Sequence, residues 1–156
     1  MRKKLTREEA RKRILYGMKQ CDIMKISEEE VAFVSEQESL EKGVSFIRDN
    51  SDIKILFVTL GNKGSIAYYK DEKIYCGGIH QEHVVDTTGA GDTFCGAVLS
   101  RILELGTDAL TEKDIREMLL FANAAASIVV TRKGALCSMP EPEEIRAASS
   151  LIDKVL

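Results

Sequence analysis

The residues whose types and spacing could do chemistry lie in the stretch VVDTTGAGDTFCGAVLSRIL, from Val84 to Leu103. A short β-branched strand signal is followed there by a glycine-rich turn and then by the apolar, small-residue pattern of a helix. A helix that begins at such a turn presents unpaired N–H groups and the positive end of its dipole, and both attract anions. The amides of Gly89 to Asp92 could therefore wrap a phosphate.

Asp92 has two interpretations, and the residues alone leave both open. An acid in the first turn of a helix stabilises that helix by about 0.5–1 kcal/mol. Alternatively, the carboxylate is a general base that takes the proton of an acceptor hydroxyl while the neighbouring amides hold the phosphoryl group in transfer. The second interpretation explains the glycines and the acid together. The sequence contains no Walker A loop, and GxGxxG fails because Phe94 stands where the third glycine is required.

The composition limits the class of protein. The chain has 156 residues, of which 44% are hydrophobic and 30% charged, which is typical of one soluble, folded domain with its own core. The net charge is −3 with acids and bases interspersed, which argues against nucleic acid as the main partner. No apolar run approaches the roughly 18–20 residues of a membrane span, so no membrane partner is expected.

The cysteines and histidines form no metal or disulfide pattern. The cysteines are far apart in the sequence and include no CxxC pair. The basic first residues are not followed by the apolar run of a secretory signal, so we expect a cytoplasmic protein with reduced cysteines and solvated histidines. These residues are Cys21, Cys76, Cys95, Cys137, His80 and His83.

The elements that must position the glycine turn can be predicted from caps and periodicity. Capping boxes at Thr6–Glu9 and Ser27–Glu30, and a Thr111–Asp114 cap, each predict a helix start. Helices are expected over residues 6–21, 27–34, 39–50, 90–105, 112–130 and after Pro140 and Pro142. Strands are expected over residues 22–26 and 53–61, with a hairpin over 65–69 and 73–77. In the helix after the glycines, Phe94, Val98, Ile102 and Leu105 share a face and Gly106 is the expected C-cap.

The alternation of helices and strands indicates an α/β fold with a mainly parallel sheet. The run IKILFVTLG is apolar without alternation, as in a strand that is covered on both faces. The one hairpin makes the expected sheet mixed.

The stretch DTTGAGDTFCGA closely resembles the C-terminal signature of the ribokinase-like (phosphofructokinase-B type) carbohydrate kinases. Three further segments resemble the family in the same order, namely DIMKISEEE, VTLGNKGS and NAAASIVVTRKGALCSMP. The resemblance implies the C-terminal half of a doubly wound, mainly parallel sheet with helices on both faces and one antiparallel hairpin. It covers nearly the whole chain, as a single nucleotide-binding and catalytic portion over residues 1–156.

The resemblance also implies roles. Asp92 would be the catalytic base, and Gly89, Ala90 and Gly91 would form the anion hole. Thr59, Gly61 and Gly64 would line the ATP site, although by themselves they are equally typical of a turn between two strands. Asn123 would lie near the adenine, whereas an asparagine in a helix is more often part of a polar face.

Metal sites follow from the same resemblance. A monovalent cation (K⁺) would be held by Asp86 and Thr88 from one side and by Val129, Arg132, Gly134 and Ser138 from the other. Mg²⁺ would arrive with ATP, held mostly by phosphates and water. Glu30 matches the acid that helps to organise magnesium, and Ser27 replaces the family's usual asparagine. A capping box is an equally good explanation of this pair.

The resemblance is greatest to the fructokinase branch, so the expected partners are ATP and a small-molecule sugar. Kinases of ribose or 2-keto-3-deoxygluconate are same-family alternatives, and a catalytically silent nucleotide-binding fragment is an alternative of another class. Family members are about twice as long, and the N-terminal half with the sugar contacts and lid is not matched. A sheet edge that would pair with that half is then exposed, and we expect a homodimer.

Overall fold

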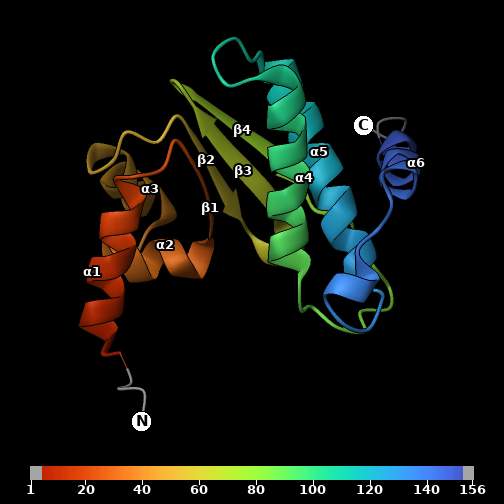
Figure 1. Ribbon diagram of the computed structural model, residues 1–156, viewed down its shortest axis with the longest axis horizontal. Coiled ribbons are helices and arrows are strands. Elements are labelled where there is room, and N and C mark those ends of the chain that lie inside the picture. Colours follow the sequence, from red (N-terminus) through yellow and green to blue (C-terminus); the bar gives the residue numbers. More distant parts are fainter. Residues whose placement is uncertain (1–4, 153–156) are drawn as a thin grey trace.

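The structure, a computed structural model, describes residues 5–152 and centres on a four-stranded sheet (Figure 1). The strand order is β1-β2-β3-β4, and β1 and β2 are parallel whereas β2–β3 and β3–β4 are antiparallel. The strands are β1 (Ile23–Ser27), β2 (Ile55–Thr59), β3 (Gly64–Tyr69) and β4 (Glu72–Gly77).

Helices cover both faces of the sheet. The first three lie on one side and the last three on the other, with α4 and α5 directly against the sheet (Figure 1). The helices are α1 (Arg7–Met18), α2 (Glu28–Ser35), α3 (Leu40–Asp49), α4 (Ala90–Leu105), α5 (Glu112–Val129) and α6 (Pro142–Ile152), with 3-10 turns η1 (Gly61–Lys63) and η2 (Leu136–Ser138).

Strand β2 explains why there are two cores. Successive side chains of a strand point to opposite faces. Ile55 and Phe57 accordingly pack into the core under α4 and α5, while Leu56 and Val58 pack into the core under α2 and α3. All four side chains are at most 1% exposed, which confirms the prediction of a strand buried on both faces.

The α/β fold with helices on both faces is confirmed, and so are the hairpin and the capping boxes of Thr6, Ser27 and Thr111. The expectation of a mainly parallel sheet is wrong within residues 5–152, where two of the three strand pairings are antiparallel. The reason is the short link from β2 to β3. A parallel crossover needs a dozen or more residues, and only the turn around η1 separates these strands.

Two smaller expectations also need correction. Val84 and Val85 are not in a strand, and their side chains are 57% and 60% exposed. The N–H of Val85 instead donates to the carbonyl of Val130 at the end of α5 (2.8 Å). Leu105 is 43% exposed, so the buried face of α4 ends at Ile102.

Candidate active site

The first turn of α4 differs from the starts of the other helices whose caps are defined. Helices α1, α2, α3 and α5 begin at a serine or threonine whose hydroxyl accepts from a backbone N–H of the first turn. Helix α4 begins at Gly89, which has φ 86° and makes no side-chain cap. Glycine adopts this left-handed conformation without a steric penalty. The start of α4 is thus left open for an external acceptor.

The backbone donors of this turn are only partly used. The N–H of Ala90 donates to the Thr87 carbonyl (3.3 Å), and that of Thr93 donates to the Gly89 carbonyl (2.8 Å). Within residues 5–152, the N–H groups of Gly91 and Asp92 have no acceptor. Asp92 itself is exposed. Two aligned donors at the positive end of a helix form an arrangement suited to an anion.

Ala90 and Gly91 of this turn line a cavity of about 410 Å³, which we call the turn cavity, whereas Gly89 and Asp92 are not among its lining residues. Its volume is within the range that small-molecule sites use. The turn cavity brings together six of the residues predicted from the sequence: Thr59, Gly61, Gly64, Ala90, Gly91 and Asn123. Much of the remaining wall is apolar, with contributions from Ile79, Val84, Phe94, Ala126 and Val130. Such a wall suits a flat, largely apolar ring.

The backbone around Gly64 is packed too closely for any side chain. Its φ is 105°, and an added Cβ would lie 2.1 Å from the Cys76 carbonyl oxygen. A Cβ on Gly78 would lie 2.2 Å from the Asn62 carbonyl oxygen. The two glycines therefore let the turn after β2 dock against the end of β4. The turn interpretation of this segment is correct, and the turn also forms a wall of the cavity.

Asn123 lines the turn cavity, but its amide is already bonded. It is 8% exposed, accepts from the Ser65 hydroxyl (3.0 Å) and donates to the carbonyls of Cys76 (3.3 Å) and Gly77 (3.2 Å). These bonds fasten α5 to the β3–β4 hairpin. Asn123 is thus not part of a polar helix face, and its bonds hold two walls of the cavity together.

Asp86 joins the segment before the glycine turn to the loop after α5. Its carboxylate accepts from the N–H groups of Thr88 (2.9 Å) and Gly134 (3.3 Å). Hydrogen bonds from the Thr88 N–H, then the Thr88 hydroxyl, then the Gly134 N–H lower the pKa of Asp86. Gly89 packs against the same loop, because a Cβ there would lie 3.0 Å from that of Ala135.

The remaining predicted cation ligands lie in or next to that loop. The Ser138 hydroxyl donates to the carbonyls of Gly134 and Ala135, and Arg132 donates to the Ser138 carbonyl and pairs with Glu144. Val129 is fully buried at the end of α5. The structure therefore brings Asp86, Thr88, Gly134 and Ser138 into one hydrogen-bonded unit. Oxygen atoms of this kind suit a hard cation.

Glu30 lies apart from this unit, at the start of α2. Its carboxylate accepts from the Ser27 N–H (2.8 Å), and the Ser27 hydroxyl accepts from the Glu30 N–H (3.2 Å). The capping-box interpretation of this pair is confirmed. Residues 5–152 contain no group of three or more His, Cys, Asp and Glu side chains that could hold a metal.

Lys25 borders the site, and the sequence analysis did not identify it. It lies in β1, and its Nζ would be 3.0 Å from a Cβ placed on Gly91. The alternation of side-chain direction along β1 could have identified Lys25 from the sequence. Ile23 packs into the core beneath α4, and Lys25 is two residues further along the same strand. A lysine is unusual in a strand position that faces a core.

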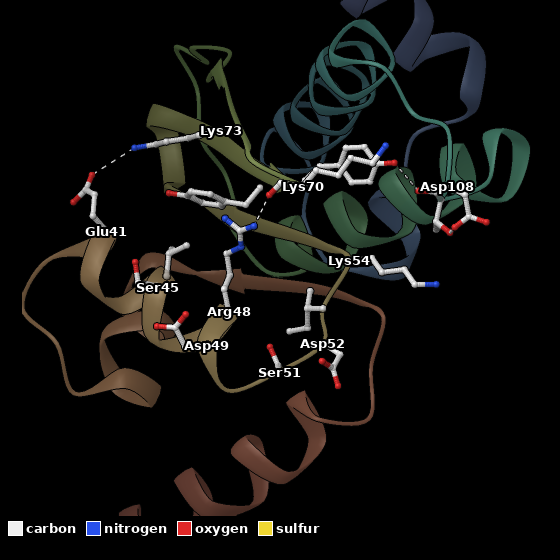
Figure 2. Close-up of a pocket in the computed structure, with 15 residues that line it drawn as sticks. Glu41, Ser45, Arg48, Asp49, Ser51, Asp52, Lys54, Lys70, Lys73 and Asp108 are labelled. Carbon is white, nitrogen blue, oxygen red and sulfur yellow. Dashed lines mark hydrogen bonds and ion pairs between the residues drawn. The ribbon is translucent and has the colours of Figure 1, made fainter.

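A second and larger cavity lies at the other end of the sheet (Figure 2). It has a volume of about 790 Å³, and we call it the charged hollow. None of the predicted site residues lines it. Its charged lining residues are Glu41, Arg48, Asp49, Asp52, Lys54, Lys70, Lys73 and Asp108. Figure 2 shows Lys73 reaching toward Glu41 and Arg48 reaching toward Lys70 across the opening.

Several other sequence expectations have a structural outcome. The four cysteines are free thiols, and His80 and His83 are exposed, as expected. Between residues 5 and 152, no helix has the length and apolar character needed to cross a bilayer.

Residues 2–142 match the family described as pfkB family carbohydrate kinase. Among curated proteins, fructokinase-1 from Oryza sativa subsp. japonica is 40% identical over 142 residues, which is 90% of this chain and 43% of the rice protein. The similarity thus extends over almost the whole described chain.

Solved structures give the same result. The fructokinase of Vibrio cholerae O395, bound to fructose, ADP and calcium, is 30% identical with a TM-score of 0.81 over 90% of this chain and 44% of its own. A double mutant of that enzyme was solved with fructose, ADP and a potassium ion. A structure described as ribokinase II from E. coli, in complex with ATP and Mg²⁺, is 28% identical, with a TM-score of 0.78 over 94% of this chain and 46% of its own. The chain spans less than half the length of each of these relatives.

Proposed function

The chain belongs to the pfkB family of carbohydrate kinases, and from this premise we propose that it supplies the ATP site, the anion hole and the general base for phosphorylation of a sugar hydroxyl. The observation that carries the proposal is the start of α4. Among the α-helices of residues 5–152 whose caps are defined, α4 alone begins without a side-chain cap, and it opens at a cavity. Free N–H donors beside a small-molecule cavity are what a transferred phosphoryl group requires.

The proposed chemistry uses few residues. The adenine lies against the apolar wall of the turn cavity, and the phosphates lie on the N–H groups of Gly91 and Asp92. Asp92 takes the proton of the sugar hydroxyl, whose oxygen forms the new bond to the γ-phosphorus as the bond to the β,γ-bridging oxygen breaks. ADP leaves with the electrons of that bond. The exposure of Asp92 supports this role, because a sugar hydroxyl can reach its carboxylate from solvent.

Two kinds of metal ion are part of the proposal. Mg²⁺ would be held by the phosphates, water and Glu30, and when bound it would neutralise charge on the β- and γ-phosphate oxygens. A monovalent cation, K⁺, would be held by oxygen atoms of the unit that contains Asp86, Thr88, Gly134 and Ser138. The potassium ion in the Vibrio cholerae structure supports this assignment.

We further propose fructose as the sugar, because fructokinases are among the most similar relatives. The proposal places the sugar contacts outside these 156 residues, since the rice, Vibrio cholerae and E. coli relatives described above are each more than twice as long as this chain. A reaction that depends on a held acceptor loses its effective-molarity advantage when that acceptor is free in solution. Little fructose phosphorylation is therefore expected from the chain alone.

Calorimetric titration of this chain with Mg-ATP tests the proposal directly. We expect saturable heat of binding, and weaker binding of adenosine because it offers nothing to the α4 amides. A circular dichroism spectrum with normal helix content serves as the folding control. A folded chain that gives no heat with Mg-ATP would contradict the proposed function.

A further inference from the structure

Lys25 occupies a position where β1 should carry an apolar side chain. In the sheet register it is paired with Phe57, which packs edge-on against Phe94 of α4. Ile23, two residues earlier, packs into the same core. Lys25 is partly buried. Its alkyl chain thus extends along the core while its ammonium group continues to the rim, where α4 begins.

The ammonium group lies against the positive end of a helix. Nζ would be 3.0 Å and Cε 3.7 Å from a Cβ at Gly91, so the absence of a side chain there makes the approach possible. The helix start carries a partial positive charge of roughly half an elementary charge. A cation at this place is unfavourable unless an anion lies near both.

The protein itself does not supply that anion in the part of the chain that the structure describes. Lys25 forms none of the ion pairs found within residues 5–152. Lys63, which like Lys25 acts on Glu29, has its Nζ 4.0 Å from Oε1 of Glu28. Lys25 does act on Glu29, an exposed residue, but the pKa of Glu29 is lowered first by the Ser27 hydroxyl, then by its own N–H, and only then by Lys25 and Lys63.

We propose that the Lys25 ammonium group binds the terminal phosphate oxygens of the nucleotide, opposite the free amides of Gly91 and Asp92. The inference rests on the proposed function and adds a side-chain cation to a site that is otherwise built from backbone. Lys25 then makes the site selective for a triphosphate over a monophosphate, because AMP has no phosphate that reaches it. During transfer, the same ammonium group neutralises charge on the γ-phosphoryl oxygens.

A structural role makes a different prediction. If Lys25 served only to cover the core with its alkyl chain, an uncharged residue of similar length would replace it without effect on ligands. Lys25→Met keeps most of the length and the apolar contact and removes only the charge. Lys73→Met is the matched control, since Lys73 lies in the charged hollow at the other end of the sheet.

The experiment is calorimetric titration of the wild-type chain and both variants with Mg-ATP, Mg-ADP and AMP. We expect Lys25→Met to weaken Mg-ATP binding by about 10- to 100-fold, the range for a lost hydrogen bond to a charged group. AMP affinity should stay within about two-fold, and Lys73→Met should bind all three ligands like the wild type. Lys25→Met binding Mg-ATP within about two-fold of the wild type overturns the Lys25 inference and leaves the proposed function intact. A folded wild-type chain that binds no Mg-ATP overturns both.

A second measurement needs no destabilising substitution. Reductive ¹³C-methylation of the lysines keeps their charge and gives each an NMR signal, and Lys25→Arg identifies that of Lys25. We expect Mg-ATP, but not AMP, to shift this signal. If saturating Mg-ATP does not shift the NMR signal of Lys25, the inference is overturned, even if Lys25→Met fails to fold.

Discussion

The two cavities lie at opposite ends of one sheet and are built in opposite ways. The turn cavity is lined by glycines, small polar residues and apolar side chains, and within residues 5–152 its only ionisable lining residue is His80. The charged hollow is almost twice as large and is lined by four acids and four bases. By size and charge alone, the hollow would be taken for the binding site.

The difference lies in which hydrogen-bonding groups are already used. In the charged hollow, Lys73 pairs with Glu41 (3.5 Å), Lys54 pairs with Asp22 (3.4 Å) and Arg48 donates to the Lys70 carbonyl. At the turn cavity, the donors of Gly91 and Asp92 have no acceptor within residues 5–152. A charged side chain that is already paired within the chain binds a ligand poorly. A backbone N–H without an acceptor can bind a ligand without breaking an existing hydrogen bond. Unused backbone donors at the start of a helix, rather than volume, therefore distinguish the candidate site.

The largest expected effect concerns catalysis. In a chimera that joins this chain to the part of the Vibrio cholerae fructokinase that it does not match, we expect fructose phosphorylation, and Asp92→Asn should lower kcat by about 10²- to 10⁴-fold. Asp52→Asn, in the charged hollow, is the matched control and should leave kcat unchanged. A coupled ADP-release assay measures both. A folded Asp92→Asn chimera with near-normal kcat would show that Asp92 only stabilises the helix start.

The next effect concerns stability. Gly64→Ala should lower the free energy of unfolding by about 3 kcal/mol, because the residue has φ 105° and its Cβ would meet three backbone atoms within 2.6 Å. Gly96→Ala is the control in the middle of α4, where a Cβ meets nothing within 4 Å, and it should stabilise the protein by about 1 kcal/mol. Urea denaturation measures the two values. Equal effects of the two substitutions would mean that the turn cavity has no rigid backbone wall.

The smallest expected effect is a pH dependence of stability that distinguishes Asp86 from Glu41. Hydrogen bonds from Thr88 and Gly134 lower the pKa of Asp86, whereas the pKa of Glu41 is lowered first by its own N–H and then by Lys73. Because both pKa values are lower in the folded state, each carboxylate stabilises the protein at neutral pH, and this stabilisation is lost as the pH falls through the folded value. Asp86→Asn should therefore flatten the loss of stability below about pH 4.

Salt distinguishes the two carboxylates further. The part of the Glu41 contribution that comes from Lys73 should shrink in 1 M salt, because screening acts on exposed charges. The Asp86 contribution comes from backbone hydrogen bonds and should persist. Acid titrations of stability for Asp86→Asn and Glu41→Gln at low and high salt check this, and an Asp86 contribution that vanishes with salt would contradict it.

Local rules predicted most of the elements that position the site. The caps at Thr6, Ser27 and Thr111, the buried strand β2 and the glycine start of α4 depend on neighbours in the sequence, and all are present. The direction of β3 was less predictable, because it depends on the length of one turn. The grouping of Asp86 with Gly134 came from the family resemblance, since no periodicity links segments so far apart.

The features that sequence reasoning missed are contacts between distant segments. The bonds of Asn123 to Ser65, Cys76 and Gly77 exist only because α5 crosses the hairpin. Lys25 is visible in the sequence as a lysine at a core-facing position of β1. Its approach to Gly91, however, depends on the packing of α4 against the sheet. Both depend on tertiary packing, which propensity and patterning do not encode.

The contacts around Gly64 also bear on the order in which the molecule assembles. Strands β2, β3 and β4 follow one another and pair with their neighbours in the chain, whereas Asp86 meets Gly134 across 48 residues. Closing that longer loop costs about 1 kcal/mol more entropy than joining residues 64 and 77. Strands β2, β3 and β4 can therefore pair early, with the close contacts of Gly64 and Gly78 already formed, before α5 packs against them. The wall that receives α4 and α5 would then be a template for the later half of folding, and the open helix start would be among the last features to reach its place.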